Sequence, residues 1–343
     1  MGDRPKPSPS IRKGAISILG ACAILVLSLT IFLTATWSKE FSQNQPEQSS
    51  QFEIKSSVNV VLLHVTARDR DGNLVGLLDK DNFQLYEDGA LQQIESFSHE
   101  DIPVTVGLVV DNSGSMKSKR PEVVAAALAF VRSSNSRDEM FVVNFNDGVS
   151  FGLPAQTPFT DQPDQLRLAL SDVAAMGRTA LYDAISGAVG HLKQGNHDKK
   201  ALIVVSDGGD NASRHTLSET LALAVKSDAM IYTIGLFDED DPDRNPQVLK
   251  KLSKATGGDA FLPESIKDVQ TICERIALEI RNQYTFTYNP SNKKQDGSYR
   301  SIKVKVNAPD RGHVMVRARS GYYAPSNGES KQMRRDLHYE SSN

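Results

Sequence analysis

The chain has 343 residues, and its 39 Lys and Arg residues nearly balance 42 Asp and Glu residues, giving a formal net charge of −3. This balance, without a basic stripe interleaved with aromatic residues, argues against a nucleic-acid partner. A chain of this length is typical of about two domains plus shorter segments. Its two cysteines, Cys22 and Cys273, lie in an apolar span and on a predicted buried helix face, which argues against a disulfide framework.

The N-terminal segment is typical of a membrane anchor. Residues 1–13 carry four basic side chains and precede an uncharged apolar segment, 14–37, that is long enough to span a bilayer as one helix. The positive charges predict a cytoplasmic tail and a C-terminal part on the periplasmic side of the cell membrane. The alternative is a cleaved signal sequence and a secreted protein, but Leu33-Thr34-Ala35 is a poor cleavage motif.

A linker and a short β segment follow. Residues 38–55 are rich in Ser, Gln and Glu and are predicted to be flexible. Residues 56–101 form a β segment that is too small to stand alone. Its strands are predicted at Val58–Asp69, Phe83–Tyr86 and Gln92–Phe97.

Residues 102–281 alternate strand-like runs with amphipathic helical segments, which predicts an α/β fold with a doubly wound, mostly parallel, Rossmann-like sheet. One helix opens at Pro121 with Val124, Leu128 and Val131 at helical spacing, and another begins with the capping-box pattern Thr216-x-x-Glu219. The last helix carries an apolar stripe of Ile266, Val269, Cys273, Ile276 and Ile280. The strands are predicted at Val104–Val110, Met140–Phe145, Ala201–Ser206 and Met230–Gly235, with an edge strand at Val149–Leu153.

Residues 282–325 form a second short β segment, followed by a tail, 326–343, that we expect to be disordered. Three strands are predicted, around Tyr284–Tyr288, Ile302–Val306 and Val314–Ala318. The two β segments can pair into one β-sandwich with the α/β unit inserted, or form two separate sheets packed on its ends.

Polar side chains follow two of the predicted parallel strands. Asp111, Ser113 and Ser115 alternate after the first strand on a loop that Gly114 tightens, and Asp207 follows the third. Ligands of such sheets bind beyond the carboxyl ends of the strands. The hard oxygens there suit a divalent cation, although a capped turn would use the same residue types.

Thr179 completes the pattern, because it stands just before the apolar-periodic helix that begins near Leu181. The order DxSxS, Thr, strand-Asp-Gly resembles the von Willebrand factor type A (VWA) domain. In that family these positions form a metal-ion-dependent adhesion site. The resemblance implies direct metal ligation by Ser113 and Ser115, ligation by Thr179 in a high-affinity state, and contacts through water from Asp111 and Asp207. It implies Mg²⁺, with Mn²⁺ or Ca²⁺ as alternatives; a degenerate, structural VWA domain is the competing interpretation.

The whole chain resembles the VWFA-related acidobacterial family of bacterial envelope proteins, which has the same order of anchor, β segment, VWA domain and β tail. The expected function is therefore a membrane-anchored binding protein whose metal accepts an Asp or Glu from a protein partner. No small-molecule substrate is expected. One alternative is a scaffold subunit of an envelope complex with a structural metal. A metal-dependent hydrolase that activates water is disfavoured, because no general base is recognisable and no enzyme activity is expected.

Other acidic and polar groups have simpler interpretations. The acidic run at 238–243 resembles a solvated loop more than a calcium site, because it lacks the EF-hand spacing. Asp210 and Asn211 are expected to cap the segment that follows them. No pair of histidines has metal-ligand spacing.

Overall fold

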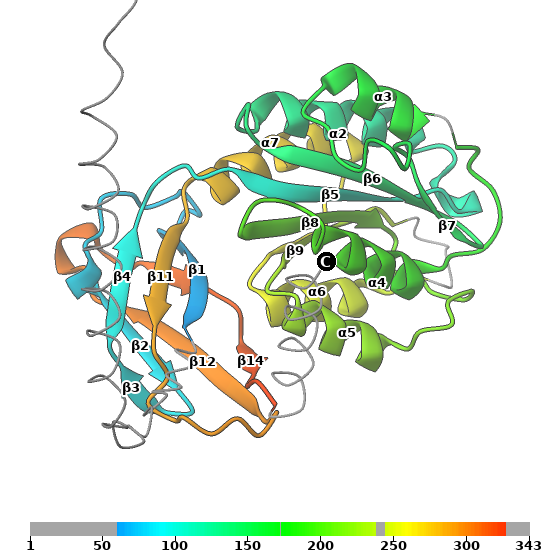
Figure 1. Ribbon diagram of the computed structural model, residues 1–343. Coiled ribbons are helices and arrows are strands. Elements are labelled where there is room, and N and C mark those ends of the chain that lie inside the picture. Colours follow the sequence, from blue (N-terminus) through cyan, green and yellow to red (C-terminus); the bar gives the residue numbers. More distant parts are fainter. Residues whose placement is uncertain (1–59, 172, 238–243, 327–343) are drawn as a thin grey trace, which may run out of the picture. The chain divides into compact units, whose positions relative to one another are not determined.

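The computed structural model describes residues 60–171, 173–237 and 244–326 (Figure 1). The predicted anchor at 14–37, the linker at 38–55, the acidic run at 238–243 and all but the first residue of the tail lie outside these ranges. Within them, no helix combines the length and the apolar character needed to cross a bilayer.

A six-stranded sheet forms the centre of the α/β unit, and its order is β10-β9-β8-β5-β6-β7. All neighbours pair in parallel except β6 and β7, which are antiparallel. Every residue of β5 is buried, since helices cover both faces of the sheet. The strands are β5 (Val104–Asp111), β6 (Glu139–Phe145), β7 (Val149–Phe151), β8 (Lys199–Ser206), β9 (Met230–Gly235) and β10 (Ala260–Phe261).

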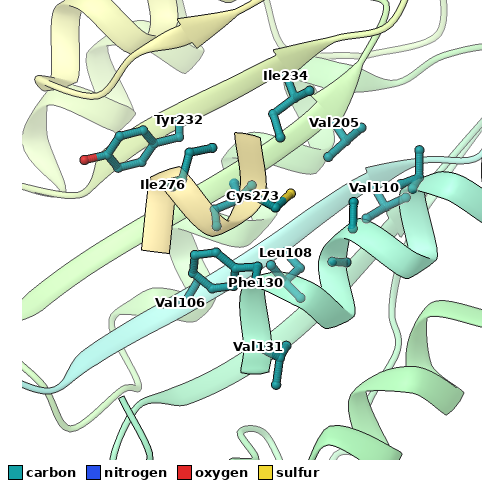
Figure 2. Close-up of a cluster of buried hydrophobic side chains, with 14 of the residues drawn as sticks. Val106, Leu108, Val110, Phe130, Val131, Val205, Tyr232, Ile234, Cys273 and Ile276 are labelled. Atoms are coloured by element: carbon teal, nitrogen blue, oxygen red, sulfur yellow. The ribbon is translucent and has the colours of Figure 1, made fainter. Parts of the chain in front are cut away.

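Three helices pack on each face of this sheet (Figure 1). One face carries α2 (Arg120–Ser133), α3 (Pro163–Ser171) and α7 (Val269–Arg281), and the other carries α4 (Leu181–Leu192), α5 (Leu217–Lys226) and α6 (Pro246–Thr256). Figure 2 shows Phe130 of α2 and Cys273 of α7 over Leu108 of β5. The predicted doubly wound, mostly parallel α/β fold is confirmed.

The buried face of α2 differs in part from the predicted one. Val131 is buried as expected, but Val124 and Leu128 are only half-buried, and Val123 and Phe130 take the central positions. Four alanines in this helix leave its hydrophobic periodicity weak. The buried face predicted from the sequence is therefore rotated by about a third of a turn from the observed one.

The capping box of α5 is present as predicted. The amide of Glu219 donates to Thr216 Oγ1 at 3.3 Å, and the amide of Thr216 donates to Glu219 Oε2 at 2.8 Å. Short 3₁₀ turns complete the structure at η1 (Lys80–Asn82), η2 (Gly114–Met116), η3 (Ile266–Asp268) and η4 (Pro309–Arg311). Ile266 of the predicted last stripe therefore lies in the turn that precedes α7.

Strands of both β segments mix in two four-stranded sheets, of order β13-β1-β11-β4 and β14-β12-β2-β3. Side chains from both sheets, including Val65, Leu85, Phe286 and Ile302, form one core. The structure thus has the single sandwich, the first of the two arrangements left open by the sequence. Its strands are β1 (Val61–Arg68), β2 (Phe83–Glu87), β3 (Ala90–Gln92), β4 (Ile94–Ser98), β11 (Tyr284–Tyr288), β12 (Tyr299–Val306), β13 (Met315–Arg317) and β14 (Gly321–Tyr323).

One predicted strand, Gln92–Phe97, is wrong as a single element. The chain leaves the sheet of β2 and β3 after Gln92 and enters the other sheet at Ile94, where β4 pairs with β11. Gln92 is buried, and its Nε2 donates to Ser291 Oγ at 2.9 Å. The loop that contains Ser291 therefore fixes the place where the chain passes from one sheet to the other. The short strand β14 was also missed.

Candidate metal centre

Asp111 and Asp207 lie at the carboxyl ends of neighbouring strands. Asp111 is the last residue of β5, Asp207 directly follows β8, and these two strands pair in parallel. Parallel strands end at the same edge of a sheet, which places both carboxylates together. Each residue is only 2% exposed. Burial of two carboxylates side by side is costly unless hydrogen bonds and a positive charge compensate them.

A continuous chain of hydrogen bonds connects the two carboxylates through the serines. The amide of Ser113 donates to Asp111 Oδ1 at 2.8 Å. The hydroxyls of Ser113 and Ser115 lie 3.1 Å apart, and Ser115 Oγ donates to Asp207 Oδ2 at 2.6 Å. Four of the five predicted site residues are therefore joined directly.

Thr179 is joined to this cluster through the backbone of its loop. On one side, the amide of Gly114 donates to the carbonyl of Gly177 at 3.2 Å. On the other side, the amide of Thr179 donates to Asn211 Oδ1 at 2.9 Å, and the carbonyl of Thr179 accepts from the amide of Asn211 at 3.0 Å. These bonds hold the threonine between the loop after β5 and the loop after β8.

The loop that carries Thr179 requires glycine at position 177. Gly177 has a φ of +85°, and a Cβ atom there would lie 1.8 Å from Asp147 Oδ2. Asp147 in turn accepts from Arg178 Nε at 3.0 Å. The close approach lets the turn after β6 and the Thr179 loop pack together beside the site.

The electrostatics of the site favour a bound cation. The pKa of Asp111 is raised from 3.8 to about 6, mainly by burial and also by the charge of Asp207, although hydrogen bonds from Ser113 and Ser206 act in the opposite direction. No ion pair of either carboxylate is found in the described part of the chain. A divalent cation would supply the missing charge, and carboxylate and hydroxyl oxygens are donors that Mg²⁺, Mn²⁺ and Ca²⁺ accept. The residues present therefore fit such an ion.

Two supporting residues make contacts that the sequence did not predict. Ser206 Oγ donates to Asp111 Oδ2 at 2.7 Å, and its position just before Asp207, at the end of a buried strand, was an available signal. Asp210 caps the segment after it as expected, because its Oδ1 accepts from the amide of Ser213 at 3.3 Å. In addition, its Oδ2 accepts from the amide of Tyr182, in the first turn of α4, at 2.9 Å. Asn211 likewise faces back to Thr179, so both residues order the Thr179 loop.

An open, doubly wound α/β sheet with a polar site at its strand ends defines a class of ligand-binding domain. Residues 106–209 match the model of the von Willebrand factor type A domain family. The chain thus contains a VWA domain, and the matched range includes all five predicted site residues. Comparison with curated proteins found no match.

Several solved structures are similar to this chain at low sequence identity. A von Willebrand factor type A protein from Catenulispora acidiphila has 12% identity, a TM-score of 0.47, and coverage of 71% of this chain and 74% of its own. An aerotolerance-related membrane protein from Bacteroides fragilis has 15% identity, a TM-score of 0.43, and coverage of 52% and 98%. The vWF domain of the pili tip protein Mfa5 from Porphyromonas gingivalis has 13% identity, a TM-score of 0.45, and coverage of 52% and 95%.

Proposed function

We propose that the protein is a binding protein that recognises an acidic side chain of a protein partner through a divalent cation, with Mg²⁺ as the first choice. The observation that carries the proposal is the pair of buried carboxylates, Asp111 and Asp207, which are linked through the backbone amide of Ser113 and the hydroxyls of Ser113 and Ser115. VWA domains in general act as interaction modules, and this site has the composition expected for one.

The donor set explains why the partner group should be a carboxylate. Ser113, Ser115 and Thr179 would supply neutral oxygens, and Asp111 and Asp207 would offset the charge of the ion. When bound, the ion would act as a Lewis acid that accepts one more oxygen ligand. Because the hydroxyls donate little negative charge, an Asp or Glu from outside is the ligand that completes the site best.

The location proposed for this activity is the periplasmic face of the cell membrane, with residues 14–37 as the anchor and residues 38–55 as a spacer. Support comes from the basic residues before an apolar segment of sufficient length. Adhesion and assembly of an envelope complex both require this kind of surface-held recognition module. A scaffold with a structural metal remains the alternative, and the partner experiment distinguishes the two.

Metal binding is tested first, with the full chain stripped of metal. Titration with Mg²⁺ should show binding by calorimetry, and Ser115→Ala should weaken it at least about tenfold, because the variant lacks one proposed ligand. Ser118→Ala is the matched control, since Ser118 is exposed on the same loop and should leave the affinity unchanged. Equal affinities for Ser115→Ala and the native chain would contradict the proposed ligand set.

Partner binding is tested by a pull-down from envelope extract, with Mg²⁺ or with EDTA. A protein captured only with Mg²⁺, and lost with Ser115→Ala but retained with Ser118→Ala, would support metal-mediated recognition. Metal-dependent thermal stability without any metal-dependent partner would favour the structural scaffold instead.

A further inference from the structure

A cleft of about 650 Å³ lies between the α/β unit and the sandwich. One wall consists of α6 and the start of β10, and the other consists of β12 and β13. None of the proposed metal ligands lines it. The cleft is therefore a separate candidate binding surface.

The rim of this cleft is basic. Lys250 and Lys254 lie one turn apart on α6, and Lys303 of β12 also lines the cleft. All three are exposed, and none has an ion-pair partner within the described ranges. The single acidic lining residue, Asp259, is already paired with Arg317, whose Nη1 lies 2.6 Å from Asp259 Oδ2. The cleft thus carries three uncompensated positive charges, which attract an anionic ligand.

Two strand edges border the same cleft. β10 is the outermost strand of the six-stranded sheet, and β13 is the outermost strand of one sheet of the sandwich. Residues of both strands line the cleft. An outermost strand presents backbone N–H and C=O groups that can pair with an added strand. This geometry favours an extended polypeptide over a lipid headgroup, which offers no matching row of donors and acceptors.

The floor of the cleft is apolar, with half-buried side chains of Val304, Val316 and Ala318. Successive side chains of an extended strand point to opposite sides. A bound strand would therefore direct every second side chain toward this floor and the others toward the lysine rim. We propose that the cleft binds an extended segment of a partner protein in which acidic and apolar residues alternate.

The test uses the full chain and a short fluorescent peptide of alternating Glu and Val. Anisotropy should show saturable binding that is unchanged by EDTA. The double variant Lys254→Glu/Lys303→Glu should bind at least about tenfold more weakly, since two attractive charges become repulsive. The matched control is Lys251→Glu/Lys305→Glu, which reverses one lysine on α6 and one on β12 outside the lining. It should change the affinity less than about twofold.

Four outcomes would overturn the proposal. The first is no saturable binding of the peptide by the native chain. The second is an equal loss of affinity in the two double variants. The third is undiminished binding of a peptide N-methylated at alternate residues, because such a peptide cannot pair with a strand edge. The fourth is binding of phosphatidylglycerol vesicles, sensitive to Lys254→Glu/Lys303→Glu, in place of the peptide, which would assign the cleft to a membrane surface.

Discussion

Arg68 of β1 and Glu279 of α7 form an ion pair in which the Glu279 carboxylate has no exposed surface. Arg317 of β13 pairs with the other carboxylate oxygen, and Tyr232 Oη of β9 donates to that same oxygen at 2.9 Å. The network therefore joins α7, the last helix of the α/β unit, to two strands of the sandwich. Such a network should make the two parts unfold together.

Replacement of Glu279 tests this coupling. Glu279→Gln would leave the buried Arg68 without its countercharge and Arg317 with Asp259 alone, so we expect a loss of about 3 kcal/mol in the free energy of unfolding. The measurement is urea denaturation followed by circular dichroism. Glu274→Gln, a half-buried residue of the same helix, should cost under about 0.5 kcal/mol. Similar losses for both variants would show that the buried pair does not stabilise the fold.

His64 makes stability depend on pH. Burial lowers its pKa from 6.5 to about 3, and the positive charges of Lys199 and Arg319 contribute. The folded chain thus holds His64 neutral, whereas the unfolded chain protonates it below pH 6.5, so stability decreases as the pH falls from 6.5 toward 3. His64→Gln should reduce the loss of unfolding free energy between pH 7 and pH 4.5 by about 2 kcal/mol.

The control for this effect is His313→Gln, because His313 is exposed. It should leave the pH dependence as it is in the native chain. If the unfolding free energy of His64→Gln depends on pH as steeply as that of the native chain, carboxylates alone cause the acid sensitivity.

Asn211 should position Thr179 without touching the metal. Asn211→Ala removes the acceptor of the Thr179 amide, and loss of such a supporting contact typically weakens metal binding about 10-fold or more. Asn211→Asp keeps a carboxyl oxygen at the same place and should retain most of the affinity. Calorimetric titration of both variants with Mg²⁺ is the measurement, and equal weakening in both would contradict the role assigned to this acceptor.

Gly177→Ala should disrupt the Thr179 loop. A methyl group at this position meets Asp147, and the φ of +85° is strained for alanine, so a loss of about 1–3 kcal/mol in stability is expected together with weaker Mg²⁺ binding. Gly148→Ala is the control on the neighbouring turn, where an added Cβ has no atom within 4 Å. A native-like Mg²⁺ affinity in Gly177→Ala would show that the loop tolerates movement.

The sheet and the site were predictable because their signals are local. β5 is a continuous apolar run that ends in Asp111, and the alternating oxygens after it require nothing distant to be recognised. Fold class and the grouping of Asp111, Ser113, Ser115 and Asp207 therefore followed from spacing and strand order.

The contacts that were missed depend on partners far away in the sequence. The Arg68–Glu279 pair joins residues 211 positions apart, and on a helical wheel Glu279 is simply one more polar residue. The division of Gln92–Phe97 between two sheets likewise depends on Ser291, 199 positions away. A single sequence offers no local signal for such pairings.

Each sheet of the sandwich contains strands from both β segments, so the sandwich can form only after the second segment has been synthesised. His64 of β1 contacts Thr285 of β11, which lies 221 residues away in the sequence. Neither β1 nor β4 pairs with another described strand of the first β segment. During synthesis the α/β unit can fold as soon as α7 is available, while β1 and β4 must wait for the strands that follow. A nascent chain arrested just after residue 281 would thus display unpaired strand edges, which invite aggregation or capture by a chaperone.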